Sequence, residues 1–124
     1  MGLEHLALGR RGEDLASSFL EDRGWRILAR NAVIAGGELD IVALWNGELV
    51  VVEVRTRSGS AVQPAEDSVG PRKLDRLVRA GRQYVEAAGW EGPWRIDIVA
   101  VTVREKGDPF LEHFEDVTSG GWFP

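Results

Sequence analysis

The 124-residue sequence has no cysteine and only two histidines, His5 and His113. The absence of cysteine excludes disulfide bonds and thiolate metal ligands, and it is consistent with a reducing compartment. Neither histidine has a second metal-binding side chain at ligand spacing, so we expect both to be surface residues. Neither residue type therefore offers a candidate site.

Long apolar segments are missing as well. No apolar run approaches the roughly 20 residues that a membrane-spanning helix needs, and residues 1–15 lack the apolar core of a secretory signal. The composition, 44% hydrophobic and 28% charged, is typical of a globular protein. We therefore expect a single cytoplasmic domain over residues 1–124, with a fraying tail over about residues 116–124.

Positive charge is scarce overall, and the net charge is −5. This balance argues weakly against a general polyanion-binding protein. Residues 54–82 differ from the rest: seven basic and three acidic residues give them a local balance of +4, which leaves −9 for the remainder. A local basic segment favours a phosphate-bearing ligand more than the mean charge opposes one.

Hydrophobic periodicity and turn residues predict the order α-β-β-β-α-β, with one further short strand near the C-terminus. Asn46-Gly47 is the strongest hairpin signal in the chain, so part of the sheet should be antiparallel. Helices placed among strands indicate an α/β fold with a central mixed sheet flanked by helices. The predicted helices cover residues 4–23 and 71–88, the predicted strands cover residues 25–31, 38–45, 48–57, 94–104 and 110–114, and residues 58–70 form a predicted loop.

The Asn46-Gly47 turn also predicts a register. A symmetric turn at this dipeptide places Asp40 opposite Glu53, and it places Glu38 opposite Arg55. Because side chains alternate between the two faces of a strand, all four charged groups should lie on one side of the sheet. Directly opposed like charges destabilise a strand pair, so Asp40 against Glu53 needs an explanation.

Two interpretations of this charged end of the hairpin are open. The first is a solvated face, which is the usual role of charged residues in a strand pair. The second is a site for a hard cation, since two carboxylates, a backbone carbonyl and waters suit Mg²⁺ or Mn²⁺. A cation would turn the repulsion between Asp40 and Glu53 into attraction. Together with a neighbouring guanidinium, it would favour chemistry on a phosphate.

The spacing of these residues resembles a known motif. Asp40, followed after twelve residues by Glu53-Val54-Arg55, resembles the D…(D/E)-x-K core of the PD-(D/E)XK nuclease superfamily. A longer ordered set of segments, which covers most of the chain, resembles the uncharacterised bacterial YraN family. These segments are GRRGEDLASSFLEDRGWRILARN (9–31), GGELDIVAL (36–44), VVEVRTR (51–57), RKLDRLVRAGRQY (72–84) and RIDIVAV (95–101).

The resemblance implies a restriction-endonuclease-like fold, similar to archaeal Holliday junction resolvases and tRNA-splicing endonuclease domains. It implies that Mg²⁺ or Mn²⁺ is bound by Glu13, Asp40, Glu53 and the carbonyl of Val54, and that Asp40, Glu53 and Arg55 are catalytic. Glu13 also has a structural alternative, because an acid early in a helix interacts favourably with the helix dipole. The implied partner is nucleic acid, DNA in preference to RNA. Related resolvases act as dimers, so a homodimer is a further expectation.

Arg55 departs from the motif, which has lysine at this position. Arginine is effectively always protonated, so it cannot serve as a general base. It can still bind a phosphate through two hydrogen bonds and stabilise negative charge. The sequence therefore predicts a divalent-metal-dependent nuclease that cleaves phosphodiester bonds in DNA. The alternatives are a non-catalytic nucleic-acid-binding module with the same fold and a structural protein that binds neither metal nor nucleic acid.

Basic residues of the 54–82 segment are the candidate nucleic-acid contacts. Residues three or four apart on the predicted second helix share a face, and cations there can contact phosphates without reading the base sequence. The alternative is a solvated helix face. The candidates are Arg57, Arg72, Lys73, Arg76 and Arg79, with Arg82 close to them in the sequence.

Asp97 is an acid inside the apolar strand segment RIDIVAV, which is unusual. Two roles are open for it. It approaches the metal site, or it pairs with a basic residue such as Arg30, and we favour the structural pair.

Overall fold

The computed structural model of the protein describes residues 2–59 and 70–118, with side chains from residue 6 onward. The side chain of His5 and most of the predicted loop and C-terminal tail fall outside these ranges. The elements follow the predicted order, and the additional strand is present. They are α1 (Gly2–Asp22), β1 (Arg26–Ile34), β2 (Gly37–Trp45), β3 (Glu48–Ser58), α2 (Pro71–Ala88), β4 (Trp94–Val103) and β5 (Phe110–Phe114).

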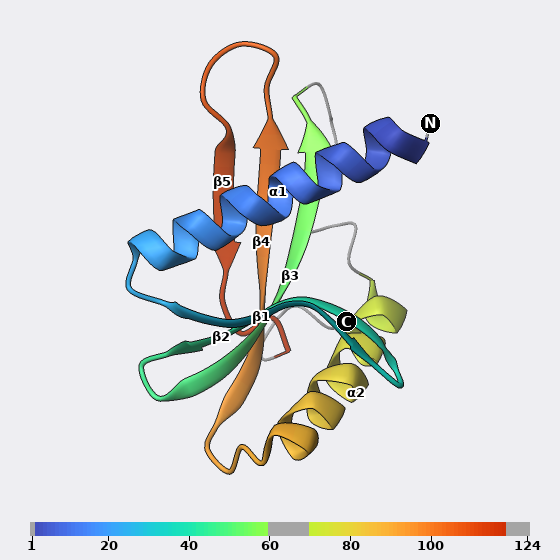
Figure 1. The fold of residues 1–124 in the computed structure, drawn as a ribbon, viewed down its shortest axis with the longest axis vertical. Helices are drawn as coiled ribbons and strands as arrows, with labels where there is room; N and C mark the ends of the chain where they lie inside the picture. Colours follow the sequence, from blue (N-terminus) through green and yellow to red (C-terminus); the bar gives the residue numbers. More distant parts are fainter. Residues whose placement is uncertain (1, 60–69, 119–124) are drawn as a thin grey trace.

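The five strands form one mixed sheet in the order β1-β2-β3-β4-β5. β3 and β4 are parallel, and every other neighbouring pair is antiparallel. A parallel pair needs a crossover connection, and α2 lies in it. The predicted α/β fold is therefore confirmed, and its architecture is compatible with a restriction-endonuclease-like fold (Figure 1). None of the described helices is long and apolar enough to cross a membrane.

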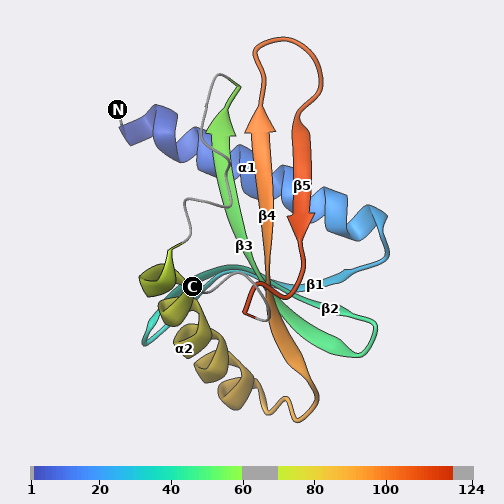
Figure 2. The same cartoon turned by 180° about the vertical axis from the view of Figure 1, so that it is seen from behind.

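The two helices cover opposite faces of the sheet, as Figures 1 and 2 show from the two sides. The alternation of side chains along β3 explains this arrangement. Val50 and Val52 point toward α1 and share a buried core with Leu20. Val51 points the other way and packs with Leu77 of α2. β3 is therefore buried on both faces, which accounts for its continuous apolar run.

The Asn46-Gly47 hairpin forms as predicted. Both turn residues have positive φ, 52° at Asn46 and 80° at Gly47. Two such residues in a two-residue turn match the twist of the flanking strands. The pairs from Trp45 with Glu48 to Ile41 with Val52 follow the predicted register.

β2 separates from β3 beyond the pair of Ile41 with Val52. The first residues of β2 keep only their pairing with β1 on the other edge, where Glu38 faces Val33. The predicted opposition of Glu38 and Arg55 is therefore wrong, and the four charged side chains do not converge as a set. The predicted register holds only as far as the pair of Ile41 with Val52.

A distortion shared by β1 and β2 accompanies this separation. Asn31 of β1 has a φ of 52°, a left-handed conformation that asparagine adopts more readily than most residues. It lies between the pairs of Arg30 with Ile41 and of Ala32 with Leu39, in the stretch where Asp40 intervenes in β2. Leu39 packs on the α2 side and Ile41 on the α1 side, although residues two apart in a regular strand share a face. The alternation therefore breaks at Asp40, where β2 leaves β3.

Asp97 has structural partners, but Arg30 is not one of those found. The fully buried carboxylate of Asp97 accepts a hydrogen bond from Nε of Arg95 at 2.9 Å. It accepts another from the main-chain N–H of Asp116 at 2.8 Å, and it lies 2.8 Å from Nε2 of His113. The predicted partner was wrong because Arg30 lies in β1, which β2 and β3 separate from β4, and its guanidinium contacts Asp14 of α1.

His113 is not the surface residue that the sequence suggested. Its ring packs edge-on against Phe19 and Trp25, at centroid distances of 6.3 and 5.3 Å. Burial alone would raise the pKa of Asp97, but the hydrogen bonds with His113, Arg95 and the main chain outweigh burial and hold this pKa below its usual value. The aspartate is therefore a charged and satisfied part of the core.

Candidate functional site

A cleft of about 300 Å³ opens where β2 separates from β3. The separation interrupts the sheet, so side chains from α1 on one face and α2 on the other reach the same space. Its walls come from α1, β2, β3 and α2. The cleft brings together all the predicted metal and catalytic residues, Glu13, Asp40, Glu53, Val54 and Arg55, and it adds Lys73.

Asp40 and Glu53 form a carboxylate pair at the centre of this cleft. Glu53 is only 4% exposed, and both side chains line the same cleft. Asp40 also accepts a hydrogen bond from the main-chain N–H of Val54 at 2.9 Å. Burial, followed by the charge of Glu53, raises the pKa of Asp40 to about 7, although the bond from Val54 opposes the rise. Asp40 can therefore keep a proton near neutral pH.

Two cations contact the buried carboxylate of Glu53. Nη1 of Arg55 lies 3.4 Å from Oε2, and Nζ of Lys73 lies 3.2 Å from the same oxygen. The sequence analysis had placed Lys73 only among the nucleic-acid contacts. The available signal was helical spacing, since Lys73 precedes Leu77 by four residues and Ala80 by seven, and both of these are buried against the sheet.

Glu13 reaches the cleft from α1, and Gly12 explains how. A Cβ atom at Gly12 would overlap the side chain of Thr56 in β3, so glycine lets the helix approach the strand closely. The side chain of Glu13 is 16% exposed and lies 3.9 Å from Nη2 of Arg30. Its charge also contributes to the raised pKa of Asp40. Glu13 therefore acts on the carboxylate pair, beyond any interaction with the helix dipole.

Comparison of the sequence with known proteins identifies the family of this chain. A sequence model of the uncharacterised protein family UPF0102 matches residues 12–101. This chain belongs to the UPF0102 family. It is 37% identical to a UPF0102 protein of Herpetosiphon aurantiacus, over 95% of this chain and 98% of that protein. It is 43% identical to a UPF0102 protein of Anaeromyxobacter dehalogenans, over 95% of this chain and 88% of that protein.

The UPF0102 match is the YraN-like family that the sequence indicated, and the matched residues 12–101 contain the whole carboxylate cleft except its rim at Leu8 and Gly9. The family description assigns no activity. What the cleft can do therefore has to be argued from its chemistry.

The predicted metal-binding side chains of this UPF0102 protein lie close together. Two of them, Glu13 and Glu53, form ion pairs with basic side chains of the same chain. Within residues 2–59 and 70–118, no three Asp, Glu or His side chains form a group arranged for a metal. Glu53 lies against Arg55 and Lys73, while Glu13 lies toward Arg30.

The donor chemistry of the pair nevertheless fits a hard cation. Asp40 and Glu53 offer adjacent carboxylate oxygens, and the pKa of Asp40 is raised by burial and then by repulsion from Glu53, a repulsion that a cation would relieve. A divalent ion bound there would compete with Lys73 and Arg55 for Glu53.

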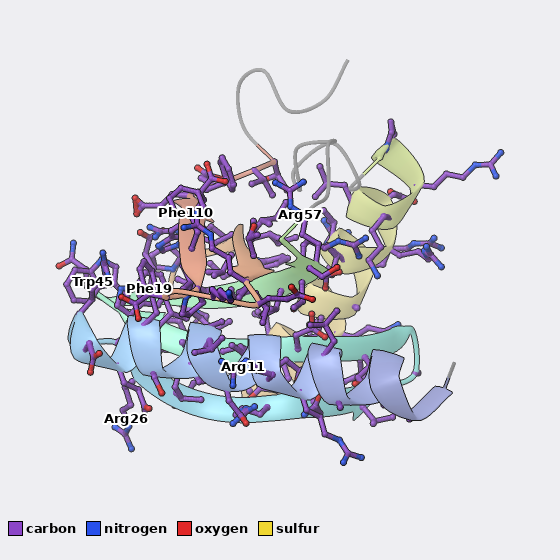
Figure 3. All side chains as sticks on the ribbon, turned by 90° about the horizontal axis from the view of Figure 1, so that it is seen from above. Arg11, Phe19, Arg26, Trp45, Arg57 and Phe110 are labelled. Atoms are coloured by element: carbon purple, nitrogen blue, oxygen red, sulfur yellow. The ribbon has the colours of Figure 1, made fainter. Side chains whose placement is uncertain are left out.

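Three of the predicted nucleic-acid contacts lie together on α2. Arg72, Arg76 and Arg79 line a groove along α2, where Arg79 also contacts Asp75 at 3.4 Å. Arg57, in β3, lies on the side of the sheet opposite α1 (Figure 3). Its Nε is 3.4 Å from Oγ1 of Thr102 in β4, so part of its bonding capacity is used within the sheet. Lys73 lines the carboxylate cleft, and with Arg76 it also lines a second cavity.

Proposed function

We propose that this UPF0102 protein is a divalent-metal-dependent nuclease that hydrolyses phosphodiester bonds in DNA, and that it is a member of the PD-(D/E)XK superfamily. The observation that carries the proposal is the carboxylate pair of the half-buried Asp40 and the buried Glu53, with Arg55 3.4 Å from Glu53. Burial and the charge of Glu53 make the ionised form of Asp40 unfavourable, and a carboxylate with such a raised pKa is typical of functional sites. The mixed sheet with its two helices is compatible with the fold of that superfamily.

Each residue of the cleft has a role in this proposal. Asp40, Glu53, Glu13 and the carbonyl of Val54 would hold Mg²⁺ or Mn²⁺, which when bound polarises a phosphoryl oxygen and lowers the pKa of a water. Arg55 holds the scissile phosphate and stabilises the negative charge that develops on it. Because arginine stays protonated, Arg55 does not take up a proton during the reaction.

The arginines of α2 fit the DNA side of the proposal. Arg72, Arg76 and Arg79 are exposed on the helix that also carries Lys73 into the cleft. Contacts from such a row to phosphates position a strand without reading its sequence. This recognition suits a nuclease that selects a DNA structure, such as a branch or a single strand. We extend the proposal to a homodimer for two-fold symmetric substrates.

A cleavage assay tests the proposal. Purified protein is incubated with Mn²⁺ or Mg²⁺ and a panel of duplex, single-stranded and four-way DNA, with RNA counterparts. We expect cleavage of at least one DNA structure, its loss in EDTA, and a loss of at least 100-fold in Asp40→Ala. Circular dichroism checks that the variant is folded, and Lys106→Met in the exposed β4–β5 loop serves as the control. Cleavage that persists in Asp40→Ala would falsify the assignment of this cleft.

The second candidate is a nucleic-acid-binding module that does not cleave. It is favoured by the engagement of Glu53 with two cations of the chain, Arg55 at 3.4 Å and Lys73 at 3.2 Å, which satisfies the carboxylate without a metal. Under this alternative, DNA binding survives EDTA and every substrate in the panel stays intact. A protein that shows neither DNA binding nor any Mn²⁺-induced change in Tm would instead be a structural protein.

A further inference from the structure

Lys73 stands between two cavities. One is the carboxylate cleft, and the other is a smaller cavity of about 120 Å³ between α2 and the turn that joins β1 to β2. We call the smaller cavity the glycine pocket, and its walls are Gly36, Gly37, Glu38, Lys73, Arg76 and Leu77 with Ala80 behind them. The volume corresponds to roughly four water molecules, enough for a small group such as a phosphate and too little for a whole nucleotide.

The glycine pocket has a fixed frame. Oε1 of Gln83 accepts a hydrogen bond from the main-chain N–H of Gly36 at 2.9 Å, which ties the β1–β2 turn to α2. Gly37 has a φ of 143°, a conformation that residues with a side chain rarely adopt. Leu77 and Ala80 are buried and form the apolar floor. The pocket is therefore built into the fold, and its charged side chains decide what it can bind.

The charge of the glycine pocket depends on where Lys73 points. Arg76 and Glu38 both line the pocket, and their formal charges cancel. Nζ of Lys73 lies 3.2 Å from Glu53, in the carboxylate cleft, so its positive charge is used there. Lysine has a long and flexible stem, and Lys73 lines both cavities. Only when the ammonium group turns from Glu53 toward Arg76 does the pocket acquire a net positive charge.

A divalent ion at Asp40 and Glu53 would bring about this turn. The ion and the ammonium group of Lys73 would be positive charges competing for the same carboxylate, and they repel one another. Arg55, which contacts the same oxygen of Glu53, adds to this repulsion. Arg76 lies three residues beyond Lys73 on α2, so both side chains can converge on one anion in the glycine pocket.

We propose that Lys73 is a positioning residue that exchanges partners: it neutralises Glu53 in the free protein, and once a divalent ion takes its place it completes, with Arg76, a phosphate-binding subsite in the glycine pocket. The ligand is a phosphate group of the strand, adjacent to the phosphate in the carboxylate cleft. The inference rests on the proposed function, because it requires a metal at the carboxylate pair. It predicts that metal and DNA binding are positively coupled, each strengthening the other.

The test measures this coupling without cleavage. A fluorescent single-stranded oligonucleotide with non-hydrolysable linkages is titrated into the protein at fixed ionic strength, in Mn²⁺ and in EDTA. We expect Mn²⁺ to tighten binding by about tenfold in the unchanged protein, and by less than about twofold in Lys73→Met. Calorimetry with Mn²⁺ alone should show that Lys73→Met binds the ion as tightly as the unchanged protein or more tightly, since a competing cation is gone. Lys106→Met, which removes the only other lysine, should behave as the unchanged protein.

A second variant, at Glu38, tests whether the charge of the glycine pocket controls oligonucleotide binding. In Glu38→Gln the pocket carries a net positive charge from Arg76 alone, so oligonucleotide binding in EDTA should tighten and the effect of Mn²⁺ should shrink. Glu91→Gln, an exposed position outside both cavities, controls for the change in net charge. Both positions are on the surface, so folding is not at risk.

The outcomes separate this inference from the proposed function. Full coupling in Lys73→Met overturns the exchange of partners, as does weaker Mn²⁺ binding in that variant, which would make Lys73 a support of the metal site. Mn²⁺ and oligonucleotide that bind independently in the unchanged protein overturn the inference and leave a metal-dependent nuclease intact. A protein that binds no Mn²⁺ overturns both.

Discussion

The ionised side chain of Asp40 is required for the proposed activity, but it lowers the stability of the folded protein. Burial and the neighbouring Glu53 raise its pKa to about 7, whereas an aspartate in an unfolded chain titrates near 3.9. The folded state therefore binds this proton more tightly than the unfolded state does. It loses stability as the pH rises from about 4 to about 7 and the proton is removed. Repulsion retained at one position in this way is a common compromise between stability and function.

Replacement of Asp40 by asparagine should therefore stabilise the protein. The amide has the same shape, and its oxygen can still accept the hydrogen bond from Val54, but it carries no charge. In EDTA at pH 8 we expect the free energy of unfolding of Asp40→Asn to rise by roughly 1–3 kcal/mol, and we expect the difference to shrink toward pH 5. Urea unfolding at both pH values measures it. An unchanged or lower stability at pH 8 would show that the repulsion is relieved in some other way.

At the scale of the helices and strands, the sequence predicted what local rules determine. The Asn46-Gly47 turn requires two positive φ values, so the hairpin and its first pairs could be read from the dipeptide. The separation of β2 from β3 could not, because it depends on the break in side-chain alternation at Asp40, which no local turn rule predicts. Glu38 was misplaced for that reason. The contact of Lys73 with Glu53 was missed because it depends on how α2 docks across the sheet.

The close packing of α1 on β3 makes the position of Glu13 testable. A Cβ atom at Gly12 would overlap Thr56, so Gly12→Ala should push the helix outward. We expect it to cost about 1–3 kcal/mol of stability and to weaken Mn²⁺ binding, because Glu13 moves with the helix. Gly9→Ala is the matched control, since a Cβ there meets nothing within 4 Å. That change should be neutral or stabilise α1 by up to about 1 kcal/mol.

Thermal unfolding and calorimetry with Mn²⁺ measure both variants. If Gly12→Ala unfolds at the same Tm as Gly9→Ala, the helix is not held at the distance that the structure gives. If it is destabilised but binds Mn²⁺ normally, Glu13 does not contribute to the metal site.

At the scale of the whole molecule, the carboxylate cleft lies where side chains from both faces of the sheet reach the same space. α1 and α2 cover opposite faces, and the gap between β2 and β3 lets Glu13 and Lys73 approach the same carboxylates. Near the start of β4, Arg95 contacts Glu48 at 2.7 Å, Asp97 at 2.9 Å and Glu115 at 3.1 Å. This second charged cluster lies outside the cleft, and it ties β3, β4 and the segment after β5 together.

The buried Asp97 should govern stability at low pH, in the opposite sense to Asp40. Burial raises its pKa, but the hydrogen bonds with His113, Arg95 and Asp116 outweigh burial, so the folded-state pKa lies below the unfolded value. The stability that Asp97 contributes is therefore complete above about pH 4 and is lost as the pH falls below it. Asp97→Asn leaves Arg95 without its buried charged partner. We expect a loss of about 2–4 kcal/mol at pH 7 and a much smaller loss near pH 3.

Urea unfolding at pH 7, 5 and 3 measures this dependence. Asp75→Asn, at a side chain that is 67% exposed on α2, controls for the removal of one negative charge and should stay within about 0.5 kcal/mol of the unchanged protein. A loss in Asp97→Asn that is as large at pH 3 as at pH 7 would mean that shape, and not charge, is what this position contributes. The predicted narrowing is the signature of a carboxylate that stabilises the sheet only while it is ionised.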